Sequence, residues 1–353
     1  MTENETRHAL LEGGVIPAMP LALTESREFD ERHQRALLRY YLEAGVRGIA
    51  AGVHTTQFEI RAYPQLFERV LRVAAEEIDA YTAGAGSAVV KVGGVLGLRE
   101  QALGEAKQLR DLGYDSALLS LSAHVGARID DLIDHCRAVA DVIPVIGFYL
   151  QEAVGGIPLP YEFWRRFAEI ERVIAVKVAP FNRYRTIDVL RAVAESGRAD
   201  DIALYTGNDD SIVFDLLSEY EFRVGSDTVR VGFVGGLLGQ WAVWTRSAVE
   251  LVEAILSMKA AGDGASRDML LYAHELTDAN AALFDAANGF RGSIAGIHEI
   301  LRRQGLFGGI YCLEPSEALS PGQVEEIDRV LAAYPHLTDD AYVAANVNRW
   351  LDH

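Results

Sequence analysis

Lys177 stands where a lysine is costly, because it lies within an apolar run, Val173–Ala179, that predicts a buried strand. The chain has only four lysines, against 29 arginines. A desolvated lysine can lose its proton and become a nucleophilic amine, whereas arginine keeps its charge. A neutral amine in a dry site is what Schiff-base formation with a carbonyl compound requires. A lysine near a strand end can also reach water or pair with a carboxylate, so the run alone leaves both interpretations open.

Tyr149 is a second candidate, because it ends another predicted strand, Ile143–Tyr149. If the strands form a barrel, Tyr149 and Lys177 could face each other at its mouth, where catalytic groups gather. A tyrosine there can carry protons to and from a carbinolamine or an aldol oxygen. A core aromatic side chain with a satisfied hydroxyl is the alternative.

The loop after the second predicted strand offers a place for a carboxylate. Gly52 and Val53 are followed there by His54, Thr55 and Thr56. Amides and hydroxyls in such a loop can hold an anion, although the same residues also serve as helix caps.

These candidates need a scaffold that brings strand ends together. Short apolar runs alternate with amphipathic segments, and eight such units over about 240 residues predict an α/β fold, a (β/α)8 TIM barrel, rather than an open doubly wound sheet. The predicted strands are Gly14–Met19, Gly48–Gly52, Ala88–Val95, Asp115–Leu121, Ile143–Tyr149, Val173–Ala179, Ile202–Thr206 and Val229–Val234. The predicted helices between them include Asp30–Glu43, Arg99–Leu112, Asp130–Ala140, Tyr161–Ile170, Thr186–Glu195 and Asp210–Tyr220.

Beyond about Trp241 the strand pattern gives way to helices. We expect residues 1–240 to form the barrel and residues 241–353 to form a helical extension, packed on the barrel or on a neighbouring subunit. The predicted helices are Ser247–Ala261, Ser266–Asn288, Ser293–Arg303 and Pro321–Ala333.

Composition restricts the partners. The net charge of −18 argues against nucleic acid and anionic membranes, because the overall field repels phosphates. Two cysteines provide neither a disulfide framework nor metal-site spacing. The polar, acidic start lacks the pattern of a signal peptide, and no apolar run approaches the roughly 18 residues of a membrane span. We therefore expect a cytoplasmic protein.

The candidate residues, in this order, resemble the dihydrodipicolinate synthase/N-acetylneuraminate lyase family of Schiff-base aldolases. Its strand-five motif pairs a tyrosine with a glycine seven residues later, as Tyr149 and Gly156 do, and its lysine follows 28 residues after the tyrosine, as Lys177 does. Gly207-Asn208-Asp209-Asp210 is similar to the family's Gly-Asp-Asp turn, and the segment around Gly232 occupies the place of its small-residue strand eight. The family's fold is a (β/α)8 barrel with a C-terminal helical extension.

The departures from the family pattern concern the second substrate. The family's Gly-Thr-Thr-Gly-Glu is replaced by Val53–Gln57, so either Thr55 or Thr56 could hold the carboxylate. Val154 stands where true dihydrodipicolinate synthases have an arginine, and His124 lies about where they have a tyrosine that crosses the subunit interface. Both losses argue against lysine biosynthesis.

The resemblance implies an aldolase, lyase or dehydratase that forms an imine between Lys177 and pyruvate or a related 2-oxo acid. It implies Tyr149 as the proton carrier, and Thr55, Thr56, His54, His124, Gly207 and Gly232 as substrate-binding residues. The partners would be a 2-oxo acid and an aldehyde, in a homo-oligomer (tetramer or dimer), without cofactor or metal.

Four alternatives stay open. Lys91, within another apolar strand, is a second candidate nucleophile. A metal-dependent barrel enzyme would use His, Asp and Glu at strand ends, but no His-x-x-x-His or Cys-x-x-Cys spacing occurs. Loops at Gly93-Gly94 or Gly235-Gly236 could hold phosphate. Lastly, the chain could be a 2-oxo-acid or sugar-acid binding protein that has lost turnover.

Overall fold

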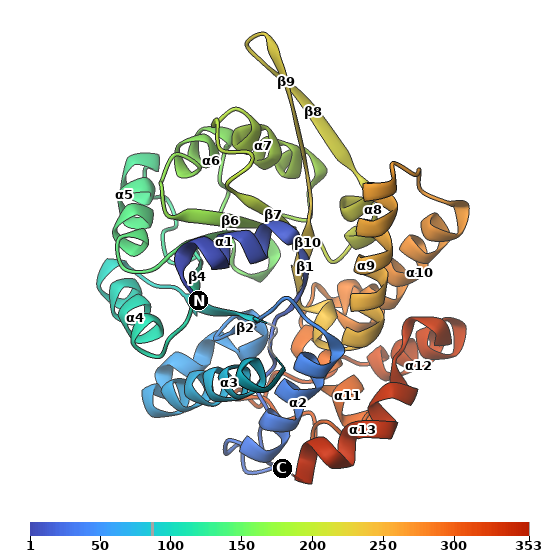
Figure 1. Cartoon of the computed structure of the whole chain (residues 1–353). Coiled ribbons are helices and arrows are strands. Elements are labelled where there is room, and N and C mark those ends of the chain that lie inside the picture. The colour runs from blue at the N-terminus through green and yellow to red at the C-terminus, as the bar shows by residue number, and fades with distance from the viewer. Residues whose placement is uncertain (86–87, 353) are drawn as a thin grey trace.

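A computed structural model describes residues 1–85 and 88–352 of the chain. At its centre, eight parallel strands form a barrel surrounded by helices (Figure 1). The strands are hydrogen-bonded in the order β1-β10-β7-β6-β5-β4-β3-β2, and a bridge between Ala18 and Ala50 joins the two ends of the sheet. The predicted (β/α)8 barrel is confirmed.

The barrel strands are buried on both faces, which explains their continuous apolar runs. One face packs inside the barrel and the other against the surrounding helices. The strands are β1 (Gly14–Pro17), β2 (Gly48–Ala51), β3 (Val90–Val95), β4 (Ser116–Leu119), β5 (Val145–Leu150), β6 (Val173–Ala179), β7 (Ala203–Thr206) and β10 (Gly235–Leu238).

An N-terminal helix that we did not predict, α1 (Glu3–Glu12), packs against the interior of the barrel. Ala9 and Leu10 of α1 join the interior apolar cluster, and the hydroxyl of Tyr205 donates a hydrogen bond to the carbonyl of Leu10 at 2.8 Å. Leu10 lies beside the N-terminal ends of the strands and covers that end of the interior. The interior is therefore open at the C-terminal ends of the strands.

The helices that follow the strands form the outer layer. Seven of them lie between β1 and β8: α2 (Glu31–Ala44), α3 (Pro64–Ala85), α4 (Arg99–Asp111), α5 (Ile129–Ala140), α6 (Tyr161–Phe167), α7 (Arg183–Ala194) and α8 (Ile212–Leu217). The start of α2 shows why the helices begin where they do: the carboxylate of Asp30 accepts a hydrogen bond from the amide of His33 at 3.2 Å. Gly45, with φ of 94°, ends the same helix.

The prediction that Val229–Val234 is the eighth barrel strand is wrong. Most of this run belongs to β9 (Asp227–Gly232), which pairs in antiparallel fashion with β8 (Glu219–Val224) in a hairpin that projects from the barrel (Figure 1). The side chains of β8 alternate between exposed and partly buried, as in a sheet with one face in water. The eighth barrel strand is β10, whose four residues are all buried.

Helices follow β10, as expected. They are α9 (Thr245–Ala261), α10 (Arg267–Leu283), α11 (Ser293–Arg303), α12 (Gln323–Ala333) and α13 (Asp340–Asp352), the last of which we did not predict. Trp350 of α13 is fully buried, 5.5 Å from the ring of Tyr40 on α2 and 5.8 Å from that of Tyr342. In the described part of the chain, no helix combines the length and apolarity that crossing a membrane needs.

We expect Trp350→Ala to lower the free energy of unfolding by about 3–5 kcal/mol, because it leaves a cavity between α13 and α2. Urea denaturation measures this loss. Tyr184→Ala, at a side chain that is 82% exposed, is the control and should change it by less than about 0.5 kcal/mol. Equal effects of the two substitutions would show that α13 does not depend on this contact.

Candidate active site

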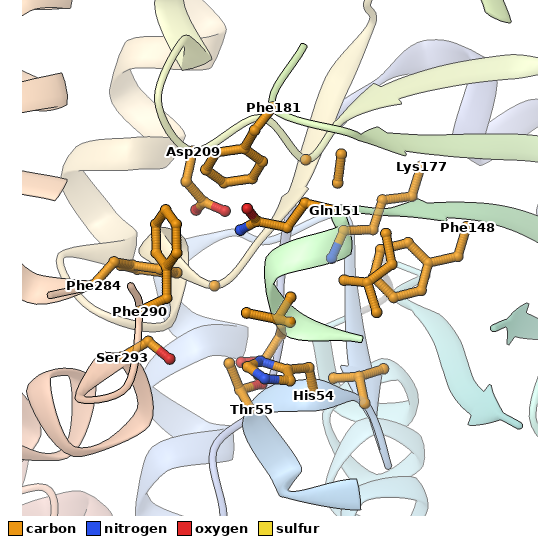
Figure 2. Close-up of a pocket in the computed structure, with 17 residues that line it drawn as sticks. His54, Thr55, Phe148, Gln151, Lys177, Phe181, Asp209, Phe284, Phe290 and Ser293 are labelled. Carbon is orange, nitrogen blue, oxygen red and sulfur yellow. The ribbon is translucent and has the colours of Figure 1, made fainter. Parts of the chain in front are cut away.

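A pocket lies at the C-terminal ends of the barrel strands, where barrel enzymes bind their substrates (Figure 2). Its empty space, together with the open solvent at its mouth, is roughly 530 Å³, and its walls come from the barrel loops and from the helical extension. The lining residues are Ala18, Val53, His54, Thr55, Phe148, Leu150, Gln151, Val154, Lys177, Ala179, Phe181, Gly207, Asp209, Gly239, Phe284, Phe290 and Ser293.

Lys177 projects into this pocket from β6, where it pairs in register with Phe148 of β5. Its amine lies 4.4 Å from the centroid of the Phe148 ring, and no residue within 1–85 or 88–352 accepts a hydrogen bond from it. Burial lowers the pKa of Lys177, because the ammonium form loses its hydration, and the negative charge of Asp209 offsets part of that shift. The amine is thus closer to the neutral, nucleophilic form than an exposed lysine is.

Gly207, directly after β7, makes room for the lysine. A Cβ atom at this position would lie 2.7 Å from Cε and 3.1 Å from Cγ of Lys177, closer than van der Waals contact allows. The requirement for glycine here is therefore one of space. The predicted substrate-binding residue Gly207 lines the pocket and also sets the path of the Lys177 side chain.

Asp209 is the second buried ionisable group of the pocket. Its carboxylate accepts a hydrogen bond from the amide of Gln240 at 3.0 Å, and the Gln240 side chain accepts one from Asn280 of α10 at 2.9 Å. Figure 2 shows the carboxylate pointing into the cavity, towards the amide of Gln151. Burial raises the pKa of Asp209 by penalising its charged form, while the Gln240 amide lowers it. Asp209 can therefore hold a proton nearer to neutral pH than an exposed aspartate.

The loop after β2 divides the predicted carboxylate-binding residues into two groups. His54 and Thr55 line the pocket, whereas Thr56 points away and donates its hydroxyl to the carbonyl of Met19 at 2.6 Å. The Thr55 hydroxyl donates a hydrogen bond to the carbonyl of Ala18 at 2.8 Å. The backbone amide of Thr55 has no acceptor among the described residues, so it can donate to a ligand. Burial lowers the pKa of His54 to about 4, so its imidazole is neutral at physiological pH.

The prediction that Tyr149 faces Lys177 is wrong. Because Phe148 shares the interior face with Lys177, the next residue of β5 points outward. The ring of Tyr149 packs 5.3 Å from that of Trp164 on α6, and its hydroxyl accepts a hydrogen bond from the amide of Leu159 at 3.3 Å. Tyr149 has the correct spacing from Lys177 but lies on the opposite face of its strand.

Two further predicted binding residues lie outside the pocket. His124, in the loop after β4, is partly exposed and packs against His135 of α5, with their ring centroids 4.3 Å apart. Gly232 lies at the end of β9, opposite Glu219, because the hairpin displaces it from the barrel. Within this chain, neither residue reaches the group around Lys177.

The structure bears on three of the alternatives. The amine of Lys91 is paired with Asp79 of α3 at 2.5 Å, outside the pocket, which disfavours it as the nucleophile. The phosphate-loop alternative is wrong, because both glycine pairs lie inside strands β3 and β10. A Cβ atom on Gly94 would lie 2.1 Å from the carbonyl oxygen of Gly52, so this glycine permits close packing. Within 1–85 and 88–352, no three His, Cys, Asp or Glu side chains are grouped as metal ligands would be.

Several lining residues were missed. Asp209 was quoted only as part of the Gly207–Asp210 turn, although a carboxylate after a barrel strand could have been proposed as an acid. Phe284, Phe290 and Ser293 come from the extension, and nothing local in their sequence indicates that they fold back over the barrel.

Comparison with known proteins agrees with the fold. N-acetylneuraminate lyase 2 of Escherichia coli O6:H1 is 23% identical over 216 residues, which are 60% of this chain and 66% of that protein. 4-Hydroxy-tetrahydrodipicolinate synthase of Archaeoglobus fulgidus is 27% identical over 198 residues, 56% of this chain and 63% of that protein. The chain thus aligns with slightly less than two thirds of the length of these relatives.

Solved structures share the fold over a longer span. Dihydrodipicolinate synthase from Oceanobacillus iheyensis superposes with a TM-score of 0.74 at 17% identity, covering 95% of this chain and 99% of that one. N-acetylneuraminate lyase from Fusobacterium nucleatum gives a TM-score of 0.70 at 17% identity, covering 92% and 99%. The model of the dihydrodipicolinate synthetase family matches residues 11–334, and the chain belongs to that family.

Proposed function

We propose that the protein is a Schiff-base-forming lyase that acts on pyruvate or a related 2-oxo acid through an imine on Lys177. The observation that carries this proposal is the desolvated, unpaired amine of Lys177 inside the barrel pocket. Membership of a family with lyase and synthase relatives supports the same class of reaction. The iminium withdraws electrons, so a carbon–carbon bond can form or break at the adjacent carbon, or water can leave.

The carboxylate of the 2-oxo acid would dock at the loop after β2. Thr55 rather than Thr56 is the residue in position, because only Thr55 lines the pocket. The backbone amides of His54 and Thr55 have no acceptor among the described residues and can donate to the carboxylate. Neutral His54 completes this side of the pocket without adding a charge.

Asp209 takes the proton-transfer role in this proposal, in place of Tyr149. Formation of the imine from the carbinolamine releases water, and a protonated carboxyl can donate the proton that the departing hydroxyl needs. The resulting carboxylate can then accept a proton from the carbon next to the imine. The raised pKa of Asp209 suits both steps, because it keeps the proton available near neutral pH.

The outward position of Tyr149 also favours a second candidate, a 2-oxo-acid or sugar-acid binding protein without turnover. Such a protein would bind its ligand at the same loop but release no product. Product formation from a 2-oxo acid and an aldehyde would exclude this candidate.

Borohydride reduction in the presence of pyruvate tests the imine directly. We expect one reduced pyruvyl adduct, located on Lys177 by peptide mapping, and none in Lys177→Arg. Lys91→Arg is the matched control, because Lys91 lies on another barrel strand but is paired with Asp79, and it should leave the adduct intact. A wild-type protein that gives no adduct with pyruvate or longer 2-oxo acids would contradict the proposal.

Gly207→Ala should slow adduct formation by roughly tenfold to a hundredfold, because the new Cβ displaces the Lys177 side chain. The rate of pyruvate trapping measures the effect. Gly104→Ala, inside α4 where an added Cβ would meet nothing within 4 Å, is the control and should leave the rate unchanged. An unaffected rate in Gly207→Ala would show that the amine does not need this path.

Asp209→Asn should change both the maximal rate and its pH dependence. The maximal rate should fall by about a hundredfold or more, since a proton carrier is lost. The negative charge of Asp209 raises the pKa of Lys177, so its removal lowers that pKa and moves the rising limb of the pH–rate profile to lower pH. The rate of pyruvate trapping, measured from pH 5 to pH 10, shows both. Asp131→Asn, at an exposed carboxylate on α5, should produce neither change. An unmoved limb in Asp209→Asn would refute the coupling.

A further inference from the structure

Three phenylalanines form a wall of the pocket across the cavity from Lys177: Phe181, Phe284 and Phe290 (Figure 2). The rings of Phe181 and Phe290 meet edge to face, with centroids 5.8 Å apart. Phe181 follows β6 of the barrel, whereas Phe284 and Phe290 belong to the turn between α10 and α11. Two segments far apart in the chain therefore supply one aromatic surface.

Both members of the edge-to-face pair have backbones in the left-handed region, which bulky side chains avoid. Phe181 has φ of 50° and Phe290 has φ of 67°. Such conformations persist only where the surroundings hold them, and they are concentrated at functional sites. For Phe181 the hold is visible: its amide donates to the side chain of Asn208 at 3.0 Å, and Asn208 donates in turn to Asp215 at 2.9 Å.

The turn that carries Phe290 is held in a similar way. Asp285, buried and also in the left-handed region, accepts hydrogen bonds from the Asn288 side chain at 2.6 Å and from the Gly292 amide at 3.0 Å. The hydroxyl of Ser320 donates to the same carboxylate at 2.5 Å. The backbones that carry Phe181 and Phe290 are thus held by hydrogen bonds to Asn208 and Asp285, which do not line the pocket.

The charged groups of the pocket limit which second reactant can bind against this wall. Among the described lining residues the ionisable ones are Lys177, His54 and Asp209. Once Lys177 has formed an imine with a 2-oxo acid, its positive charge faces that substrate's own carboxylate. Val154 lines the pocket as an apolar group, and Arg185 of α7 pairs with Glu152 and does not line it. A second anion would therefore meet the carboxyl of Asp209 and no cation of its own.

We propose that the second reactant is an uncharged aldehyde with an apolar chain or ring, held against Phe181, Phe284 and Phe290; this rests on the proposed function. The imine, formed with loss of water, releases a proton from the carbon next to it and becomes an enamine. That carbon attacks the aldehyde carbon, and the carbonyl electron pair moves to oxygen, which takes up a proton. Hydrolysis returns the lysine amine and releases a 4-hydroxy-2-oxo acid; in the cleavage direction the same steps release the aldehyde.

A panel of aldehydes with pyruvate tests this inference. We expect kcat/KM for benzaldehyde and isobutyraldehyde to exceed that for succinic semialdehyde and glyceraldehyde by about tenfold or more. A preference for the anionic or the polyhydroxylated aldehyde would overturn it. Borohydride trapping with pyruvate alone, on the same preparation, separates the two proposals. No adduct on Lys177 defeats the proposed function, whereas an adduct without the expected preference defeats only this inference.

Two substitutions locate the preference on the wall. Phe290→Ala should lower the ratio of kcat/KM for benzaldehyde to that for acetaldehyde by about tenfold, since only the larger aldehyde reaches the wall. Phe290→Leu keeps an apolar side chain for the case in which the alanine variant does not fold, and it should lower the ratio less. Tyr184→Ala removes an exposed aromatic ring and should not change the ratio. Val154→Arg adds a cation and should raise kcat/KM for succinic semialdehyde. An unchanged benzaldehyde-to-acetaldehyde ratio in both Phe290 variants would refute a role for this wall.

Discussion

The pocket is organised around an amine that has been removed from water. On the interior face of β6, Lys177 loses the hydration that would keep it charged, and no described side chain binds it in compensation. Phe148 shares that face because the two strands pair in register, and Gly207 leaves the space that the side chain needs. Asp209 retains enough interaction with the amine to moderate the shift in its pKa. The lowered pKa of the lysine thus follows from its burial inside the closed barrel.

The sequence alone predicted most of the barrel, because fully buried parallel strands leave continuous apolar runs. Seven of the eight predicted strands overlap barrel strands, and Val173–Ala179 has the predicted limits. The eighth was misplaced because Val229–Val234 is as apolar as a barrel strand, although most of it lies in a hairpin with one exposed face. The short run Gly235–Leu238 carries too few side chains to be recognised before the structure shows that both its faces are buried.

The site was predicted only in part, for a physical reason. The position of a residue along a strand or loop can be counted in the sequence. The sequence could therefore predict four residues that line the pocket: Lys177, His54, Thr55 and Gly207. Which face a side chain occupies depends on register with the next strand, and this placed Tyr149 against Trp164 instead of Lys177. Contributions from the extension, such as Phe290, depend on how distant helices pack and leave no trace in local sequence.

Two parts of the chain build the pocket. Hydrogen bonds connect Asn280 of the extension through Gln240 to Asp209, and Phe284 and Phe290 of the extension form part of the wall. The barrel supplies Lys177, the loop after β2, Phe181 and Asp209, whereas the extension supplies Phe284, Phe290 and Ser293. Mutations in the extension can therefore change this side of the pocket while Lys177 and its neighbours Phe148 and Gly207 stay in place. If the pocket binds two reactants as proposed, the preference for the second can change through substitutions outside the barrel, with the lysine site kept intact.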